Sequence, residues 1–174
     1  MFIMSTIEFQ DYAKDIKLNL GAVLRDDPES KLKKNQIYAI ALSCAYAVKD
    51  HNIINYIFAQ SGDVLTEAEV KAAQTAATIM AMNNVYYRFV HLVSDEDFGN
   101  LPAKLRMNAM ANPTVDKIDF ELYSLAVSAI NGCGLCIDSH VKQIIAGGVN
   151  KPTIQHAIRI ASVINATAQA LFIN

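Results

Sequence analysis

Hydrophobic positions recur along almost the whole chain with the period of about 3.6 residues that is typical of α-helices. Almost no segment alternates apolar and polar residues over a stretch long enough to form a β-strand. The pattern therefore predicts an all-α fold, with helices over residues 6–24, 30–49, 53–60, 66–93, 102–111, 116–131, 133–146 and 152–172.

Several helix ends carry sequence signals that agree with this periodicity. Thr66 is followed three residues later by a glutamate, which is the spacing of a capping box. Asn150 stands just before Pro152, as at many helix starts, and Gly147 and Gly148 form a stop signal. These residues indicate where three of the predicted helices begin or end.

Two segments of the chain resemble each other. The segment QIYAIALS at residues 36–43 matches ELYSLAVS at residues 121–128, and the helices that follow them share a pattern of small residues. We interpret the match as a duplication of a helical unit. Composition alone offers another explanation, because buried helices draw on few residue types.

A duplication predicts one domain over residues 1–174 that is built from two related helical halves, at about 30–93 and 116–174. Only the second half carries a distinctive motif, because Val48 stands where the second half has Cys133. We therefore expect the first half to be scaffold.

Charge and composition limit the partners of the chain. It has 174 residues with 15 basic and 17 acidic side chains, a net charge of -2, so no field of one sign exists to bind nucleic acid or an anionic membrane. Apolar residues make up 52% of the chain and charged residues only 18%, below the usual share of about 25%. This surplus of apolar side chains predicts buried subunit interfaces, and hence an oligomer.

The start of the chain and its apolar stretches predict a cytoplasmic protein without a membrane helix. No basic segment precedes the first apolar residues, and no small-residue cleavage site follows them. The longest apolar stretch, residues 37–48, is shorter than the ~20 residues that a membrane helix needs. An odd number of cysteines, three, favours a reduced compartment, where a cysteine pair indicates metal or redox chemistry.

The most informative segment is ELYSLAVSAINGCGLCIDSH, residues 121–140. Its C-x-x-C motif, Cys133 and Cys136, lies at the expected start of a helix, where two such cysteines can close a small disulfide. The free amides and the dipole of a helix N-terminus stabilise a thiolate, which is the nucleophilic form of cysteine. An Asn-Gly turn signal just before the motif would place both cysteines in the first helical turn.

His140 and Glu121 are the candidate partners of these thiols. Cys136 and His140 are four residues apart and so share one helical face, roughly 6 Å apart. If the chain reverses at the Asn-Gly pair, Glu121 and His140 lie at similar heights on neighbouring helices, given a rise of about 1.5 Å per residue. A carboxylate that orients an imidazole beside a thiol is the arrangement of an activated nucleophile.

Other uses of the motif are weaker. Zinc is the main alternative, because Cys133, Cys136 and His140 could be three ligands, although no second C-x-x-C or H-x-x-x-H supplies a fourth. An iron–sulfur cluster would need four cysteines, and attached c-type haem would need His in place of Ile137. A thioredoxin-like site would follow a strand in an alternating α/β chain.

The segment EL-Y-SLAVSAINGCGLC-x-x-x-H resembles the alkyl hydroperoxide reductase D (AhpD) family, within the wider carboxymuconolactone decarboxylase-like superfamily. The similarity extends over LPAKLRMNAMANP at residues 101–113 and the whole second half, with a weaker match in the first half. The resemblance implies an all-helical fold of two related halves and a homotrimer. It also implies a thiol-dependent peroxidase that reduces a partner peroxiredoxin and is itself reduced by dihydrolipoamide on a lipoylated protein.

The resemblance also assigns roles to four residues. It implies that Cys136 is the peroxidatic cysteine, that Cys133 is its disulfide partner and proton donor, and that Glu121 and His140 form the proton relay. One position departs from the family pattern, because well-studied members carry a second His before the second cysteine and this chain has Leu135. The peroxidase rate and the protein partner are the properties that this change puts in question.

The leading hypothesis is an antioxidant enzyme that reduces hydroperoxides through a Cys133–Cys136 pair, with an external dithiol as electron donor and no bound cofactor or metal. The rival enzyme class is a decarboxylase or lactone-processing member of the wider superfamily, which has no need for a C-x-x-C motif. A third reading is a non-enzymatic module for redox or metal binding.

The remaining cysteine and histidines are expected to have no role in the chemistry. Cys44 lies in an apolar helix and is interpreted as a buried, inert thiol. His51, His91 and His156 have no paired constellation, so each is expected at a helix end or on the surface.

Overall fold

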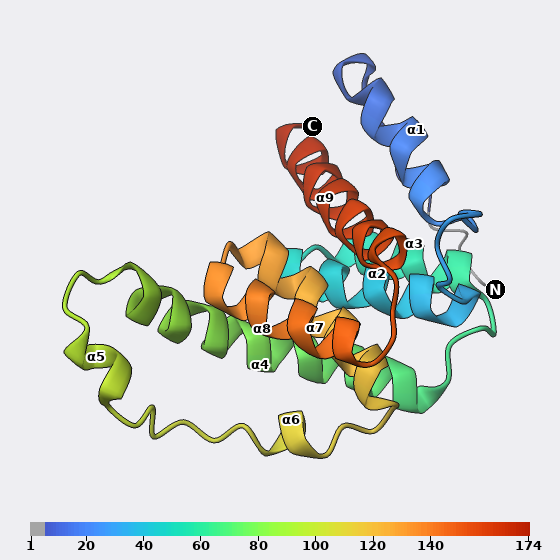
Figure 1. The fold of residues 1–174 in the computed structure, drawn as a ribbon. Helices are drawn as coiled ribbons and strands as arrows, with labels where there is room; N and C mark the ends of the chain where they lie inside the picture. Colours follow the sequence, from blue (N-terminus) through green and yellow to red (C-terminus); the bar gives the residue numbers. More distant parts are fainter. Residues whose placement is uncertain (1–5) are drawn as a thin grey trace.

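The computed structural model describes residues 6–174, which form helices and irregular segments without a strand (Figure 1). The all-α prediction is confirmed. The elements in chain order are the 3₁₀-helix η1 (Asp11–Ala13) and the α-helices α1 (Lys14–Val23), α2 (Lys34–Val48), α3 (His51–Ser61), α4 (Glu67–Leu92), α5 (Asp97–Asn100), α6 (Asn108–Ala111), α7 (Lys117–Asn131), α8 (Gly134–Ala146) and α9 (Lys151–Ile173). The expectation about a leader at the chain's start falls partly on residues 1–5, outside the described residues.

Helices α2 and α7 form the centre of the molecule and pack against each other, while α4 and α9 each contact both of them (Figure 1). The nine consecutive residues 37–45 of α2 are buried, and so are the nine residues 120–128 of α7. A helix that is buried on all sides belongs in the middle of a core. Helix α8 packs against α7 and α4, and this contact positions the cysteine motif.

The helix ends follow local capping chemistry. Thr66 and Glu69 form the predicted capping box at the start of α4, and the Asn150 side chain accepts a hydrogen bond from the Thr153 N–H at the start of α9. Helix α8 ends at Ala146, immediately before the predicted glycine stop. These three predictions are confirmed.

Three predicted helices differ from the observed ones. The first begins at Lys14 after a 3₁₀ turn rather than at residue 6, and the second begins at Lys34 rather than at residue 30. The predicted helix over residues 102–111 is reduced to α6. Lys104 adopts a left-handed φ of 53°, which an α-helix does not tolerate, so residues 102–107 run as an irregular connector. The expected loop at 94–101 contains α5.

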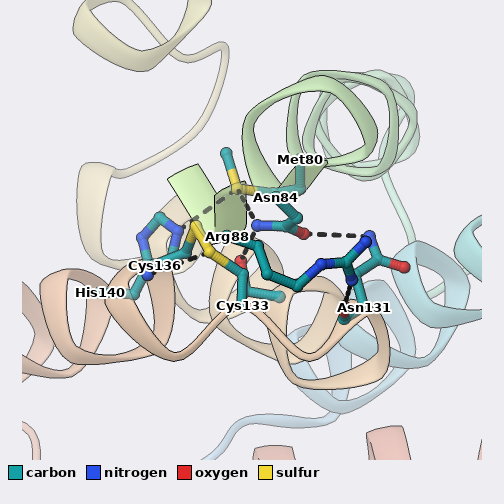
Figure 2. Close-up of a disulfide and its surroundings, with 8 residues drawn as sticks. Met80, Asn84, Arg88, Asn131, Cys133, Cys136 and His140 are labelled. Carbon is teal, nitrogen blue, oxygen red and sulfur yellow. Dashed lines mark hydrogen bonds between the residues drawn. A yellow bond between two sulfur atoms is a disulfide. The ribbon is translucent and has the colours of Figure 1, made fainter. Parts of the chain in front are cut away.

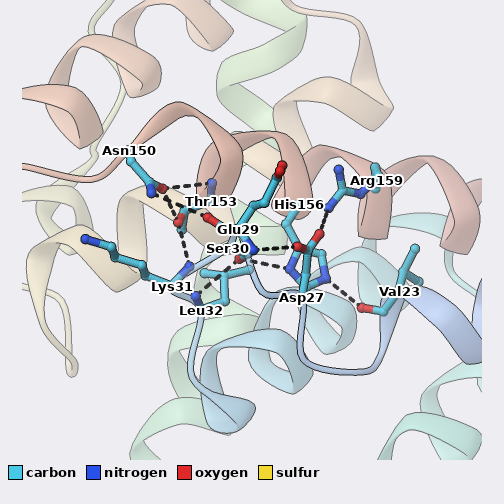
Figure 3. Close-up of polar contacts among 10 residues, drawn as sticks. All are labelled: Val23, Asp27, Glu29, Ser30, Lys31, Leu32, Asn150, Thr153, His156 and Arg159. Atoms are coloured by element: carbon cyan, nitrogen blue, oxygen red, sulfur yellow. Dashed lines mark hydrogen bonds and ion pairs between the residues drawn. The ribbon is translucent and has the colours of Figure 1, made fainter.

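His156 is buried, which corrects the expectation of a helix-end or surface position. It is 2% exposed on α9, where its Nε2 hydrogen-bonds the Val23 carbonyl oxygen at 2.9 Å and its Nδ1 lies 3.0 Å from Ser30 Oγ (Figure 3). Arg159 on the same helix pairs with Asp27. These contacts hold the segment between α1 and α2 against α9. His51 and His91 are exposed, as expected.

Helix α9 also carries the contacts that bring the two ends of the described chain together. The Tyr12 hydroxyl donates to the Ala170 carbonyl oxygen at 3.2 Å and lies 2.6 Å from Asn174 Oδ1. Within residues 6–174, α9 alone is long and apolar enough to cross a membrane, judged by its length and composition. It packs against α1, α2 and α7 and contributes buried residues along its length, as a core helix does.

Candidate active site

Cys133 and Cys136 are joined in a disulfide, with their Cα atoms 5.3 Å apart. Gly132 ends α7 with a left-handed φ of 68°, which turns the chain sharply into α8. Helix α8 begins at Gly134, one residue later than predicted, so Cys133 is its N-cap residue and only Cys136 lies in the first turn. The Cys133 Sγ accepts a hydrogen bond from the Cys136 N–H at 3.3 Å. The motif thus lies at the positive end of a helix dipole, where a thiolate is stabilised.

The two sulfur-bearing residues differ in exposure. Cys133 is completely buried, whereas Cys136 is 7% exposed and lines a cavity of about 330 Å³. Leu135 and Ser139 from the same helix also line this cavity, as does His140. A small molecule that enters the cavity therefore meets Cys136 rather than Cys133.

Glu121 and His140 form a buried pair behind the disulfide. The Oε2 atom of Glu121 on α7 lies 2.6 Å from Nδ1 of His140 on α8, and both residues are 5% exposed. The estimate from helical rise predicted that the two residues lie at similar heights on neighbouring helices, and in the structure their side chains are in contact. The contact fixes the ring of His140, because a hydrogen bond at one nitrogen orients the other.

The second ring nitrogen of His140 faces a methionine. Its Nε2 lies 3.3 Å from Sδ of Met80, a residue of α4 that is 1% exposed (Figure 2). The sequence suggested only that His140 shares a face with Cys136, and both do line the same cavity. The recorded contact of Nε2, however, is with the thioether.

The first half of the chain contributes directly to the cavity, which corrects the expectation that it is scaffold alone. Helix α4 supplies Met80, Asn83 and Tyr87 to the lining, and the short helix α6, which lies between the two halves, supplies Met110. The Oδ1 atom of Asn83 is buried without a hydrogen-bond partner among the described residues. The sequence did not predict these side chains as part of the site, because a methionine or asparagine in a long helix carries no signal of what it faces across the core.

A polar network holds α4 against the end of α7 beside the cysteines (Figure 2). Asn84 is fully buried, donates to Ser128 Oγ at 2.9 Å, and accepts from Asn131 Nδ2 at 3.0 Å. Arg88 donates to the backbone oxygen of Asn131. A buried network whose members are paired specifies one arrangement of its helices, and here it fixes the turn that leads into the motif.

Cys44 lies apart from this site. It is fully buried in α2, and burial raises the pKa of its thiol, so the inert thiol expected from sequence matches its surroundings. Among residues 6–174 no three His, Cys, Asp or Glu side chains are grouped as metal ligands. In this state the motif sulfurs are bonded to each other and Nδ1 of His140 faces Glu121, so these donors do not converge on one point.

Comparison with known proteins connects this site to a family. Residues 96–173 match the model of the Carboxymuconolactone decarboxylase family. A protein of Coxiella burnetii (strain Dugway 5J108-111), named alkyl hydroperoxide reductase AhpD, is 55% identical over 166 residues, 95% of this chain and 94% of the relative. Proteins of the same name from Beijerinckia indica and Rhodospirillum centenum are 51% and 48% identical over 92% of this chain, and the match covers 88% and 85% of their lengths. The chain therefore belongs to the AhpD family of peroxide-reducing oxidoreductases.

Proposed function

We propose that this protein is a thiol-dependent peroxidase and disulfide reductase that cycles through the Cys133–Cys136 pair. The observation that supports the proposal most directly is a disulfide with one half facing a cavity and a buried carboxylate–imidazole pair behind it. A redox reaction needs the cysteine pair, whereas the decarboxylase chemistry suggested by the wider family does not. The site thus favours the redox hypothesis over its rival.

In the oxidative half, the Cys136 thiolate attacks the distal oxygen of a hydroperoxide. The O–O bond breaks, Cys136 becomes a sulfenic acid, and the alkoxide leaves and takes up a proton. Cys136 has this role because its side chain reaches the cavity and Cys133 is buried. His140, held by Glu121, removes the proton that makes the thiolate.

In the next step Cys133 attacks the sulfur of the sulfenic acid. The disulfide forms, and the hydroxide that leaves is released as water after protonation. The two cysteines are three residues apart at the start of α8, so the disulfide closes within about one helical turn. Burial of Cys133 protects this thiol from direct oxidation.

The reductive half needs an external dithiol, for which we propose dihydrolipoamide carried on a lipoylated protein. The dithiol loses two electrons and two protons and becomes a cyclic disulfide, while Cys133 and Cys136 return to thiols. A partner peroxiredoxin would use the same reduced pair as its own reductant. No bound cofactor takes part in either half.

The test is hydroperoxide consumption with dihydrolipoamide as electron donor. Cys136→Ser should abolish consumption, and Cys133→Ser should stop turnover but trap a sulfenic acid on Cys136 that a dimedone-type probe labels. Cys44→Ser is the matched control, because the thiol that it removes is buried away from the cavity, and this variant should keep wild-type turnover.

Mass spectrometry of each variant after one equivalent of peroxide assigns the roles. Labelling that appears on Cys133, with Cys136 unreactive, would reverse them. Turnover in the Cys133→Ser/Cys136→Ser double variant would contradict redox catalysis by this pair, and stoichiometric zinc in the purified reduced protein would instead support a metal-binding module.

A further inference from the structure

Both ring nitrogens of His140 face atoms that accept hydrogen bonds. Glu121 Oε2 lies 2.6 Å from Nδ1, and Met80 Sδ lies 3.3 Å from Nε2. A thioether sulfur carries no hydrogen, so it can only accept. The contact is favourable when Nε2 bears a hydrogen. When Nε2 bears none, its lone pair faces a lone pair of the Met80 sulfur, and the contact is repulsive.

The geometry points to Met80 as a positioning residue that keeps a hydrogen on Nε2 of His140 while the disulfide is closed. Two proton arrangements satisfy both contacts. Either the imidazolium donates to Glu121 and Met80, or a protonated Glu121 donates to Nδ1 and Nε2–H donates to Met80. Both arrangements contain the same number of protons and the same Nε2–H group, so the inference does not depend on which of them holds.

Asn83 and Ser139 also carry oxygen atoms that line the cavity, but neither is recorded within hydrogen-bond distance of Nε2. The ionisable side chains that face the cavity beside His140 are Tyr87 from α4 and Cys136 from α8, and Cys136 is in the disulfide. Glu121 from α7 is engaged at Nδ1, and α6 contributes the uncharged Met110. The recorded hydrogen-bond partner of Nε2 is Met80 alone.

This inference rests on the proposed function and assigns His140 a different role in each half of the cycle. With the disulfide closed, His140 is a proton donor. A dithiol that enters the cavity first attacks Cys136, and Cys133 leaves. When the second thiol of the reductant closes its cyclic disulfide, the Cys136 sulfur leaves as a thiolate and takes the Nε2 proton. The dithiol supplies both electrons. One of its two protons goes to Cys133 and the other is released to solvent, because Cys136 takes its proton from Nε2. Nε2 is then free to act as the base for the next peroxide.

The first test is ¹⁵N NMR of the imidazoles in the oxidised protein near neutral pH. In the wild type, Nε2 of His140 should show the chemical shift and one-bond coupling of a protonated nitrogen. Met80→Leu and Met80→Ile remove the acceptor at nearly constant volume, and the Nε2–H signal should be weakened or lost. Met80→Gln restores an acceptor oxygen and should restore the signal.

Met110→Leu is the matched control, because Met110 lines the same cavity but is not a recorded hydrogen-bond partner of His140. It should leave the Nε2–H signal unchanged. Equal Nε2–H signals in the wild type, Met80→Leu and Met80→Ile would overturn the inference. An equal loss of signal in Met110→Leu would also overturn it, because it would show that a methionine in the cavity matters only through its polarity. Thermal melting identifies any variant that is not folded.

A kinetic measurement separates this inference from the proposed function. Met80→Leu should slow reduction of the disulfide by dihydrolipoamide by up to about tenfold, the effect of losing one hydrogen bond, and Met80→Gln should recover part of the rate. An unchanged reduction rate would overturn the assigned role. If hydroperoxide is not consumed by the wild type but the NMR signals behave as described, the peroxidase proposal fails and the Met80–His140 contact stands.

Discussion

Leu135 lies at the mouth of the cavity, in the first turn of α8 between the two cysteines, and is 39% exposed. A histidine there would bring a partly cationic group next to the thiolate of Cys136 without disturbing the core. Leu135→His should therefore raise the rate at which iodoacetamide alkylates Cys136 in the reduced protein near pH 7, by a few-fold. Leu135→Ala tests loss of the apolar side chain alone and should change little. Equal rates in all three proteins would contradict this prediction.

Tyr123 at the centre of α7 is a buried residue with an unpaired polar group. It is 0% exposed, its hydroxyl has no hydrogen-bond partner within residues 6–174, and burial raises the pKa of the phenol. An unpaired buried hydroxyl costs about 1–3 kcal/mol in the folded state. Tyr123→Phe should therefore leave the free energy of unfolding unchanged or raise it by about 1 kcal/mol, as measured by urea denaturation.

The contrast is Tyr12, whose hydroxyl is paired with groups at the end of α9. Tyr12→Phe should lower the free energy of unfolding by about 0.5–1.5 kcal/mol, because it removes satisfied hydrogen bonds. A loss of stability in Tyr123→Phe as large as that in Tyr12→Phe would contradict the prediction for Tyr123.

At the scale of elements, the start of α4 gives a pH dependence. Burial opposes ionisation of Glu69, but hydrogen bonds from the Thr66 N–H, the Asn35 amide and the Thr66 hydroxyl outweigh it and lower the pKa of the carboxyl below its ordinary value of 4.5. Because the pKa of this carboxyl is lower in the folded than in the unfolded state, the ionised carboxyl stabilises the fold at pH values above its pKa in the unfolded state. This contribution is lost as the pH falls through the folded value.

Between about pH 5 and pH 3, the wild type should therefore lose more stability than Glu69→Gln, which keeps a capping side chain without the charge. Urea denaturation at several pH values measures the difference. Glu67→Gln is the matched control, because Glu67 is an exposed glutamate in the same turn. Parallel stability curves for the wild type and Glu69→Gln would contradict the prediction.

Helices were predictable from sequence where periodicity and capping residues agreed. Thr66 and Asn150 fixed the starts of α4 and α9, because their side chains bond to backbone amides only a few residues away. The predicted second helix begins four residues too early, because residues 30–33 are not helical and the Ser30 hydroxyl bonds to His156 on α9. Lys104 carried no signal for its left-handed backbone, so the irregular connector was missed.

Some residues of the candidate site were predictable from local sequence, and others were not. Cys133 caps α8, which carries Cys136 and His140, and Glu121 is close enough along the chain for helical rise to place it. Met80 lies 60 residues from His140, and its contribution depends on how α4 crosses α8. Such packing is set by the whole core, and no local pattern in α4 shows which of its buried side chains faces the cysteines.

At the scale of the whole molecule, the end of α4 and the connector after it expose apolar side chains. Val85, Phe89 and Leu92 follow one another at helical spacing on α4, Phe98 lies on α5, and Leu101 follows α5 directly. With the low share of charged residues, this surface predicts an oligomer, and the family resemblance implies a homotrimer. Light scattering should give about three times the 19.1 kDa chain mass.

Phe89→Lys should dissociate this oligomer, since a charge would be buried at the interface. Leu18→Lys on α1 is the control, because Leu18 is also an exposed apolar residue, but on a helix remote in sequence from this surface. A wild-type mass near 19 kDa in dilute solution would contradict the prediction of an oligomer.

The contact between Tyr12 and the end of α9 has a consequence for chain topology. Asn174 Nδ2 also lies 3.4 Å from the Glu8 carbonyl oxygen, so the first described residues and the last lie side by side. A circular permutant can therefore join Asn174 to Ile7 through a short flexible linker and open the chain after Lys104, in the irregular connector. The permutant should melt cooperatively and still close the Cys133–Cys136 disulfide, which thiol titration measures. Wild-type protein with the same linker inserted after Lys104 is the control, and a permutant that fails to fold while this control folds would show that chain order matters to the fold. If the permutant folds, the fold does not depend on the order of the two halves along the chain, and the half that carries the cysteines can be placed first.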